Sequence, residues 1–170
     1  MDLKHYIRDI QDFPKPGIIF KDITTLLKDR KAFNYAIEEL KKALNDQDID
    51  AIAGIESRGF IFGSALAFSM GIGFIPVRKF GKLPSTTFDV EYELEYGTDQ
   101  LSIHTDAIVA GQKIAIIDDV LATGGTARAT ADLIEKAGGE VSSLGFIMGL
   151  SFLKGLEKIN KFNVITLINY

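Results

Sequence analysis

Apolar residues recur along the chain with two different spacings, which predicts alternating helices and strands. Over residues 31–45 the spacing is three or four, as in an amphipathic helix, with the apolar side chains at Phe33, Ile37, Leu40 and Leu44. Short continuous apolar runs, typical of buried strands, cover residues 50–55, 72–77, 113–118, 141–150 and 164–168. Strands that alternate with helices predict an α/β fold with a mostly parallel twisted sheet flanked by helices.

The segments between these runs complete the predicted order of elements. Further helices are expected at residues 2–11, from about residue 58, and over 126–137. Residues 12–21 are rich in Pro and Gly and predict a loop, as do residues 79–85. Residues 86–94 and 100–104 are expected to pair as a hairpin across Gly97.

The stretch Gly59–Val77 carries no charged residue and approaches the length of a membrane span. It contains four Gly, two Ser and a Pro, and Arg58 and Arg78 flank it directly. These features favour a buried helix followed by a buried strand, with the break at residues 71–73. We therefore expect no membrane-spanning segment.

The composition fits one domain over residues 1–170, with 46% apolar and 25% charged residues. The formal net charge of −4 gives no electrostatic reason to expect a nucleic-acid partner. The chain has no Cys, which excludes a disulfide scaffold and a thiolate metal site. The charged N-terminal residues lack the apolar core of a signal peptide, so we expect a cytoplasmic protein.

The stretch Ile114–Thr126 (IAIIDDVLATGGT) joins a buried strand, two acids and a glycine turn before a helix. Adjacent glycines let several backbone N–H groups point inward, and the helix N-terminus adds its positive end, so the turn can bind a phosphate. The acids Asp118 and Asp119 can accept hydrogen bonds from ribose hydroxyls and can favour a divalent cation. The spacing fits a ribose that lies across the acids, with its 5-phosphate held by Ala122, Thr123, Gly124, Gly125 and Thr126.

The alternative is a structural strand–turn–helix unit with two solvated acids, since such turns are common. The full string is more specific than the turn alone. Other phosphate motifs do not fit, because no G-x-x-x-x-G-K-[ST] occurs and Gly71-Ile72-Gly73 lacks the third Gly of a dinucleotide fingerprint.

The string resembles the signature of the type I phosphoribosyltransferases. Four other segments resemble the adenine phosphoribosyltransferases in order and spacing, namely FPKPGIIFKD, GIESRGFIFG, PVRKFGKLP and YELEYGTDQ at residues 13–22, 54–63, 76–84 and 92–100. The resemblance covers about residues 7–150. It implies the type I fold with a short base-binding N-terminal segment at about residues 1–30, a core at about 31–170, and a mobile loop at about 79–99.

The resemblance also implies roles for individual residues. The pyrophosphate-binding residues would be Ser57, Arg58, Arg78, Lys79, Lys82 and Tyr96. The adenine-binding residues would be Ile19, Phe20, Lys21 and Val120. Glu95 is the candidate acid and base near adenine, and Arg58 would assist the departure of pyrophosphate. The family usually has Arg at position 21 and often Leu at position 120, so side-chain contacts there are expected to differ. The family fold often has a cis peptide in the loop at residues 56–59.

Each of these roles has a plain structural alternative. Arg58 could be a surface cation at a helix start, although a cation there opposes the helix dipole. Arg78, Lys79 and Lys82 could be a solvated charge run. Phe20 could belong to the core.

The resemblance predicts that adenine and phosphoribosyl pyrophosphate react to give AMP and pyrophosphate, with Mg²⁺ held by substrate oxygens rather than by the protein. It also predicts a homodimer, and aromatic surface is available for an interface at Phe60, Phe62, Phe68 and Phe74. Two alternatives stay open, a phosphoribosyltransferase for another base such as guanine, hypoxanthine or xanthine, and a regulatory protein that kept only the ligand site.

Overall fold

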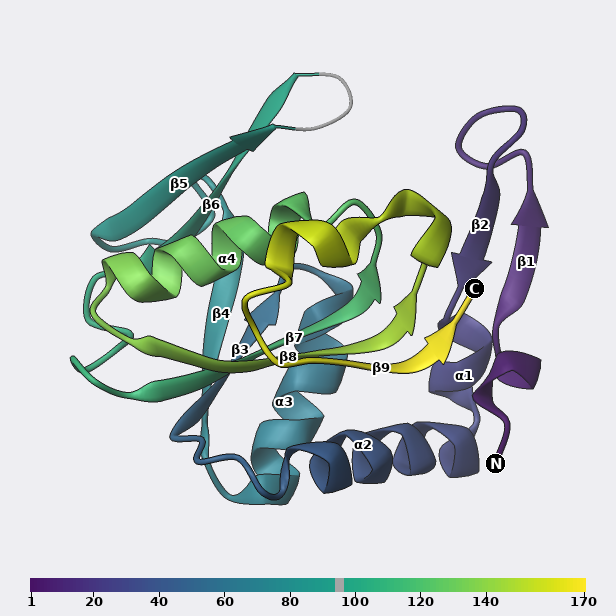
Figure 1. Ribbon diagram of the computed structural model, residues 1–170, viewed down its shortest axis with the longest axis horizontal. Helices are drawn as coiled ribbons and strands as arrows, with labels where there is room; N and C mark the ends of the chain where they lie inside the picture. Colours follow the sequence, from purple (N-terminus) through teal and green to yellow (C-terminus); the bar gives the residue numbers. More distant parts are fainter. Residues whose placement is uncertain (94–96) are drawn as a thin grey trace.

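The computed structural model describes residues 1–93 and 97–170, and its centre is a mixed sheet (Figure 1). Among these residues seven strands pair in the order β5-β6-β4-β3-β7-β8-β9. Their bounds are Thr87–Glu93, Thr98–His104, Gly73–Lys79, Ala51–Ile55, Lys113–Leu121, Glu140–Gly149 and Val164–Asn169. The five strands from β4 to β9 are parallel, whereas β5 and β6 form an antiparallel hairpin. The predicted mostly parallel sheet and the predicted hairpin are both confirmed.

Helices cover both faces of the sheet, as Figure 1 shows. The helices α2 (Arg30–Leu44) and α3 (Arg58–Met70) lie on one face, and α4 (Gly125–Lys136) lies on the other. Successive side chains of β7 point to opposite faces. Accordingly, Ile117 packs with Leu40 of α2, and Ile116 packs with Leu133 of α4, so each face has its own apolar core.

Two of the helices begin within one residue of the predicted positions. At the start of α2, Asp29 accepts hydrogen bonds from the backbone N–H groups of Lys31 and Ala32, both at 2.9 Å, which satisfies two of the free donors of the first turn. At the end of α3, Gly71 has the left-handed φ of 71° that stops a helix. The apolar stretch is therefore split as expected, and no helix in the described parts of the chain is long and apolar enough to cross a membrane.

The N-terminal segment differs from the prediction. Residues 2–11 are not one helix, because a single 3-10 helix at Leu3–Tyr6 gives way to the strand β1 (Arg8–Gln11). This strand pairs with β2 (Ile19–Asp22), so the predicted loop over residues 12–21 ends before Ile19. A helix of ten residues is marginal by itself, whereas pairing gives both strands hydrogen-bond partners. The short helix α1 (Thr24–Lys28) follows β2 and was not predicted.

Candidate active site

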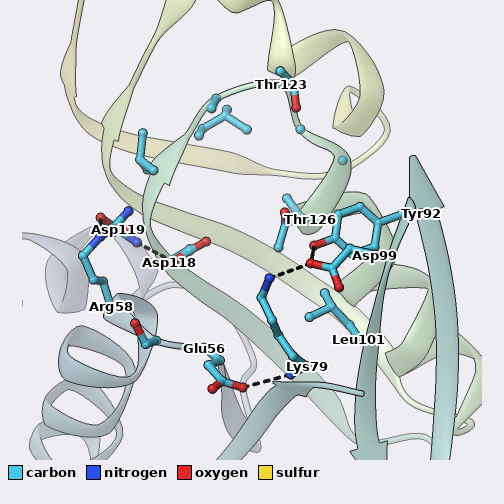
Figure 2. Close-up of a pocket in the computed structure, with 17 residues that line it drawn as sticks. Glu56, Arg58, Lys79, Tyr92, Asp99, Leu101, Asp118, Asp119, Thr123 and Thr126 are labelled. Atoms are coloured by element: carbon cyan, nitrogen blue, oxygen red, sulfur yellow. Dashed lines mark hydrogen bonds and ion pairs between the residues drawn. The ribbon is translucent and has the colours of Figure 1, made fainter. Parts of the chain in front are cut away.

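The three loops with predicted chemistry meet at one edge of the sheet. They follow β3, β4 and β7, which are neighbours in the order β4-β3-β7, so their carboxyl ends lie together. A pocket of about 490 Å³ opens there (Figure 2). Its lining includes Glu56, Ser57, Arg58, Lys79, Tyr92, Asp99, Leu101 and residues 118–127.

The two acids lie inside the end of β7 rather than after it. The sequence predicts that this strand ends at Asp118, but it continues to Leu121, because β8 still pairs with it at Val120 and Leu121. Strand geometry turns Asp118 and Asp119 to different sides. Both carboxylates line the pocket (Figure 2).

The glycine turn forms directly beyond β7. Gly124 has a left-handed φ of 78°, a conformation that a residue with a side chain adopts only with strain. Its carbonyl accepts the N–H of Arg128 at 2.9 Å, and α4 begins at Gly125, one residue before the predicted start. The free N–H groups of the first turn of α4 therefore lie beside the pocket, together with Thr123 and Thr126.

Arg58 joins the helix start to the second acid. Its Nε donates to Asp119 Oδ2 at 2.5 Å, and Asp119 is buried while the Arg58 side chain is 44% exposed. The guanidinium carbon also lies 5.6 Å from the centre of the Phe20 ring. Arg58 is thus held at the pocket between β7 and the N-terminal segment, and it is not an isolated surface cation.

Asp118 lies in a less favourable place for a negative charge. Burial, together with the neighbouring charge of Asp119, raises the pKa of the Asp118 carboxyl well above 3.8. The first turn of α3 contributes to this crowding, since a Cβ on Gly59 would be 2.9 Å from Asp118 Oδ1 and 2.8 Å from the carbonyl oxygen of Ile117. The missing side chain at Gly59 lets α3 approach the acid.

Glu56, which sequence reasoning did not select, organises the basic loop. Arg78 donates to both of its carboxylate oxygens, at 3.3 and 3.2 Å, and the backbone N–H of Lys79 donates to it at 2.9 Å. Burial acts to raise the pKa of Glu56, but these hydrogen bonds hold it below 4.5. The guanidinium of Arg78 also donates to the carbonyl oxygen of Lys82 at 3.0 Å. Arg78 and Lys82 therefore support the loop and do not line the pocket.

Two further pocket residues that the sequence did not select, Tyr92 and Asp99, come from the hairpin β5–β6. Asp99 binds Lys79 Nζ at 2.6 Å, and this contact lowers the pKa of Asp99 and raises that of Lys79. The Tyr92 hydroxyl, opposite Asp99 in the hairpin register, donates to the same carboxylate at 3.4 Å. Figure 2 shows the three side chains together across the pocket from Arg58. Lys79 is therefore not an unpaired surface cation, because it pairs with Asp99 and lines the pocket.

The predicted adenine residues divide into two groups. Val120 lines the pocket, whereas Ile19, Phe20 and Lys21 lie on β2 at its side. The ring of Phe20 packs on Phe13, with ring centres 5.3 Å apart, and it is part of neither apolar core among the described residues. Lys21 donates to Asp9 at 2.7 Å and lies 4.0 Å from the ring centre of Tyr170, so its ammonium group is directed elsewhere.

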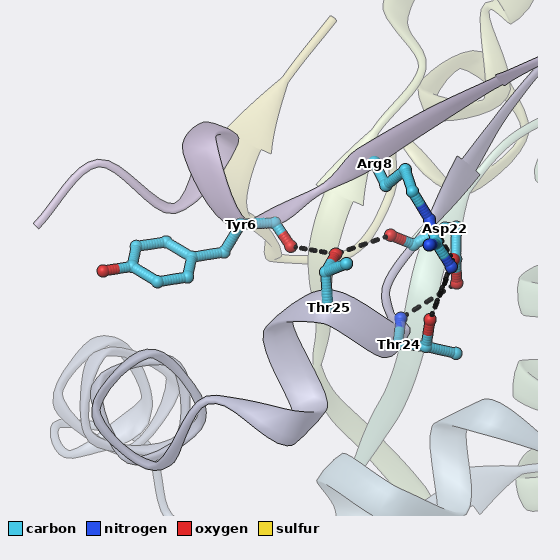
Figure 3. Close-up of polar contacts among 5 residues, drawn as sticks. All are labelled: Tyr6, Arg8, Asp22, Thr24 and Thr25. Atoms are coloured by element: carbon cyan, nitrogen blue, oxygen red, sulfur yellow. Dashed lines mark hydrogen bonds and ion pairs between the residues drawn. The ribbon is translucent and has the colours of Figure 1, made fainter.

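A buried acid, Asp22, joins β2 to the neighbouring strand β1 and to the start of α1 (Figure 3). Asp22 accepts from the Thr24 backbone N–H at 2.9 Å and from its hydroxyl at 2.8 Å, and Arg8 Nη2 donates to it at 2.5 Å. The hydrogen bond from the Thr24 backbone N–H lowers the pKa of Asp22 from 3.8 to about 2. Arg8 contributes to this fall, whereas burial acts in the opposite direction. Thr25 adds a hydrogen bond to the carbonyl oxygen of Tyr6 at 2.7 Å.

Two predictions could not be placed. Glu95 and Tyr96 lie outside the described residues, which end at Glu93 and resume at Gly97.

The cis peptide expected in the loop at residues 56–59 is present between Glu56 and Ser57.

Comparison with known proteins agrees with this arrangement. A family model described as a phosphoribosyl transferase domain matches residues 24–164. An adenine phosphoribosyltransferase from Caldanaerobacter subterraneus subsp. tengcongensis is 57% identical over 99% of this chain and 98% of its own length. The crystal structure of adenine phosphoribosyltransferase from Thermoanaerobacter pseudethanolicus is 56% identical and covers 99% of this chain and 98% of its own, with a TM-score of 0.97. The enzyme from Saccharomyces cerevisiae, in complex with adenine and an imino-altritol bisphosphate, is 42% identical and covers 98% and 96%, with a TM-score of 0.92.

The fold and the acid–glycine turn at the end of β7 define a type I phosphoribosyltransferase. The sequence identity of more than 50% over nearly the full length of adenine phosphoribosyltransferases narrows this class to one family. The chain belongs to the adenine phosphoribosyltransferase family.

Proposed function

We propose that the pocket beyond β3, β4 and β7 transfers ribose 5-phosphate from phosphoribosyl pyrophosphate to adenine, which gives AMP and pyrophosphate for purine salvage. The observation that carries the proposal is one pocket with a phosphate-binding glycine turn, two acids and the cations Arg58 and Lys79. Its occupants therefore include a phosphate, a polyol and further negative charge.

The 5-phosphate binds in the turn formed by residues 122–126. The backbone N–H groups at the start of α4 point to it, and the hydroxyls of Thr123 and Thr126 add donors. The ribose hydroxyls donate to Asp118 and Asp119. Negative charge at these acids also stabilises the positive charge that develops at the anomeric carbon as the glycosidic bond breaks.

The diphosphate leaves between Ser57 and Arg58 on one side of the pocket and Lys79 on the other. These three residues bind the charge that builds up on the leaving group. Arg78 and Lys82 add positive charge behind these residues, and Tyr96 is proposed to take part in binding the diphosphate. Because Arg58 and Lys79 are paired with Asp119 and Asp99 in the structure, the diphosphate must compete with these two carboxylates.

Adenine binds between the N-terminal segment and the end of β7. Phe20 stacks on the base, Val120 contacts its other side, and the backbone of Ile19 and Lys21 reads its polar edge. Support comes from Arg58, which contacts Phe20 and lies at the wall of the pocket. Glu95 exchanges the proton at N9 of adenine. Closure of residues 79–99 keeps water from the anomeric carbon.

Mg²⁺ fits this site through its substrate. The described residues contain no group of three or more His, Cys, Asp or Glu able to hold a metal by themselves. We propose that diphosphate and ribose oxygens supply the ligands of the cation, and that Asp118 and Asp119 add negative charge nearby. The cation would neutralise charge on the leaving diphosphate.

We further propose that the chain forms one catalytic domain, with its base-binding segment at about residues 1–30. We also propose that it works in the cytoplasm and forms a homodimer. Phe68 on α3 is 90% exposed and Ile61 of the same helix is 39% exposed, which supplies apolar surface for a second copy. Light scattering should give twice the mass of the chain, and a monomer at micromolar concentration would reject the dimer.

The experiment for the site is the double variant Asp118→Ala/Asp119→Ala, assayed for AMP formation by chromatography. Loss of activity by a factor of about 10³ or more is expected, because ribose contacts and transition-state charge are both removed. Asp48→Ala, which removes an exposed carboxylate remote from the pocket, is the control. AMP formation at the wild-type rate in the double variant would reject the site.

A further inference from the structure

A turn near the C-terminus lies directly behind the phosphate turn. Lys154 adopts a left-handed φ of 54°, and Gly155 then begins a 3-10 helix at Gly155–Ile159. A Cβ on Gly155 would overlap the carbonyl oxygen of Ala122 and would be 2.9 Å from the backbone N of Gly124. Conversely, a Cβ on Gly124 would overlap the carbonyl oxygen of Gly155. The two backbones touch with no space for a side chain on either.

The C-terminal turn is itself fixed to the core. Leu150 donates to the carbonyl oxygen of Leu121 at 2.9 Å, which ties the end of β8 to the end of β7. Beyond Gly155, Ile159 is fully buried in the core beneath α4. Lys161 pairs with Glu135 of α4 at 2.9 Å. The segment that supports the phosphate turn is thus held at both of its ends.

We propose that Gly155 is a positioning residue for the 5-phosphate site. This inference rests on the proposed function, which assigns the 5-phosphate to residues 122–126. Ala122 and Gly124 bracket the peptide groups that face the phosphate, so the backbone of Gly155 sets the direction of their N–H groups. Catalytic contacts of this kind lose strength with displacements below 1 Å.

The support acts on one half of the ligand only. The phosphate turn belongs to β7 and α4, whereas the wall for the diphosphate belongs to the loops after β3 and β4. Gly155 contacts the phosphate turn and is absent from the lining of the pocket. A change at Gly155 should therefore weaken ligands that carry a 5-phosphate and leave pyrophosphate binding unchanged.

The test is Gly155→Ala with dissociation constants from calorimetry. We expect AMP and ribose 5-phosphate to bind about tenfold more weakly and pyrophosphate to bind within about twofold of the wild type. The matched control is Gly73→Ala, since a Cβ on Gly73 has Ala51 Cβ as its neighbour, at an ordinary distance of 3.8 Å. Equal weakening of all three ligands, or none, would overturn the inference.

A second measurement uses the unaltered protein, in case the variant does not fold. Saturation with AMP should slow hydrogen exchange at residues 153–159, and saturation with pyrophosphate should not. Absence of this difference would overturn the role of Gly155 while AMP still binds. Failure of the unaltered protein to bind AMP would instead reject the proposed function.

Discussion

The substitution Asp22→Asn tests how firmly β1, β2 and α1 are held together within the base-binding segment. Asp22 is 7% exposed, and its carboxylate accepts from the backbone and hydroxyl of Thr24 and from Arg8. The amide oxygen can still accept from the Thr24 backbone, and the Thr24 hydroxyl can turn to accept from the NH₂ group, but this group meets the Nε and Nη2 donors of Arg8. The charge and the two hydrogen bonds from Arg8 are lost in a buried place, which is costly.

The magnitude follows from the pKa. A fall from 3.8 to about 2 corresponds to about 2 kcal/mol, at 1.36 kcal/mol for each pKa unit. Because the pKa is lowered in the folded state, this contribution is fully present above pH 3.8 and is lost as the pH falls toward 2. We expect Asp22→Asn to lower the free energy of unfolding by about 2 kcal/mol at pH 7.

Urea denaturation at several pH values measures this difference, and the KM for adenine should rise with it because β2 carries Phe20. Asp9→Asn is the matched control, since Asp9 pairs with Lys21 in the same hairpin but is 48% exposed. Its effect should stay below about 1 kcal/mol. Equal stability of Asp22→Asn and wild type at pH 7, or a difference that grows toward pH 3, would refute the reasoning.

Three further substitutions test the electrostatics and packing of the pocket. Asp118→Asn should raise the thermal midpoint at pH 7 and reduce AMP formation. Because the pKa of Asp118 is raised in the folded state, the stability of the protein falls as the pH rises above 3.8, and the uncharged amide removes this loss. An unchanged midpoint would contradict the burial of the Asp118 carboxylate. Gly59→Ala should lower stability by about 1–3 kcal/mol in urea denaturation, because its Cβ would meet Asp118 and Ile117, and a neutral effect would show that α3 can shift freely. Asp99→Asn should strengthen inhibition by pyrophosphate about threefold at low salt, since it removes the carboxylate that competes for Lys79, and weaker inhibition would mean that Asp99 orients Lys79.

The sequence predicts those parts of this protein whose signals are local. The continuous apolar run at Ile114–Ile117 and the glycines at 124 and 125 place a buried strand and a helix start within a few residues of each other. Parallel neighbours then bring the ends of β3, β4 and β7 to one edge. That the polar side chains after these strands lie together can therefore be predicted without knowing any side-chain contact.

The parts that were missed depend on long-range pairing. Tyr92 and Asp99 face each other because of the hairpin register, and the predicted second strand, at residues 100–104, begins only after Asp99. Glu56 gives no local signal, because its partners Arg78 and Lys79 come from a different strand. The contact between residues 122–124 and the turn at Gly155 joins segments about thirty residues apart and cannot be read from spacing.

The measurement that tests the central claim most directly is base selection by the purified protein. Phosphoribosyl pyrophosphate and Mg²⁺ are incubated with adenine, guanine, hypoxanthine or xanthine, and nucleotide and pyrophosphate are quantified. The account predicts AMP and pyrophosphate in equal amounts from adenine and turnover of the other bases at least about 10² lower. Turnover of guanine or hypoxanthine without adenine, or no nucleotide from any base, would contradict it.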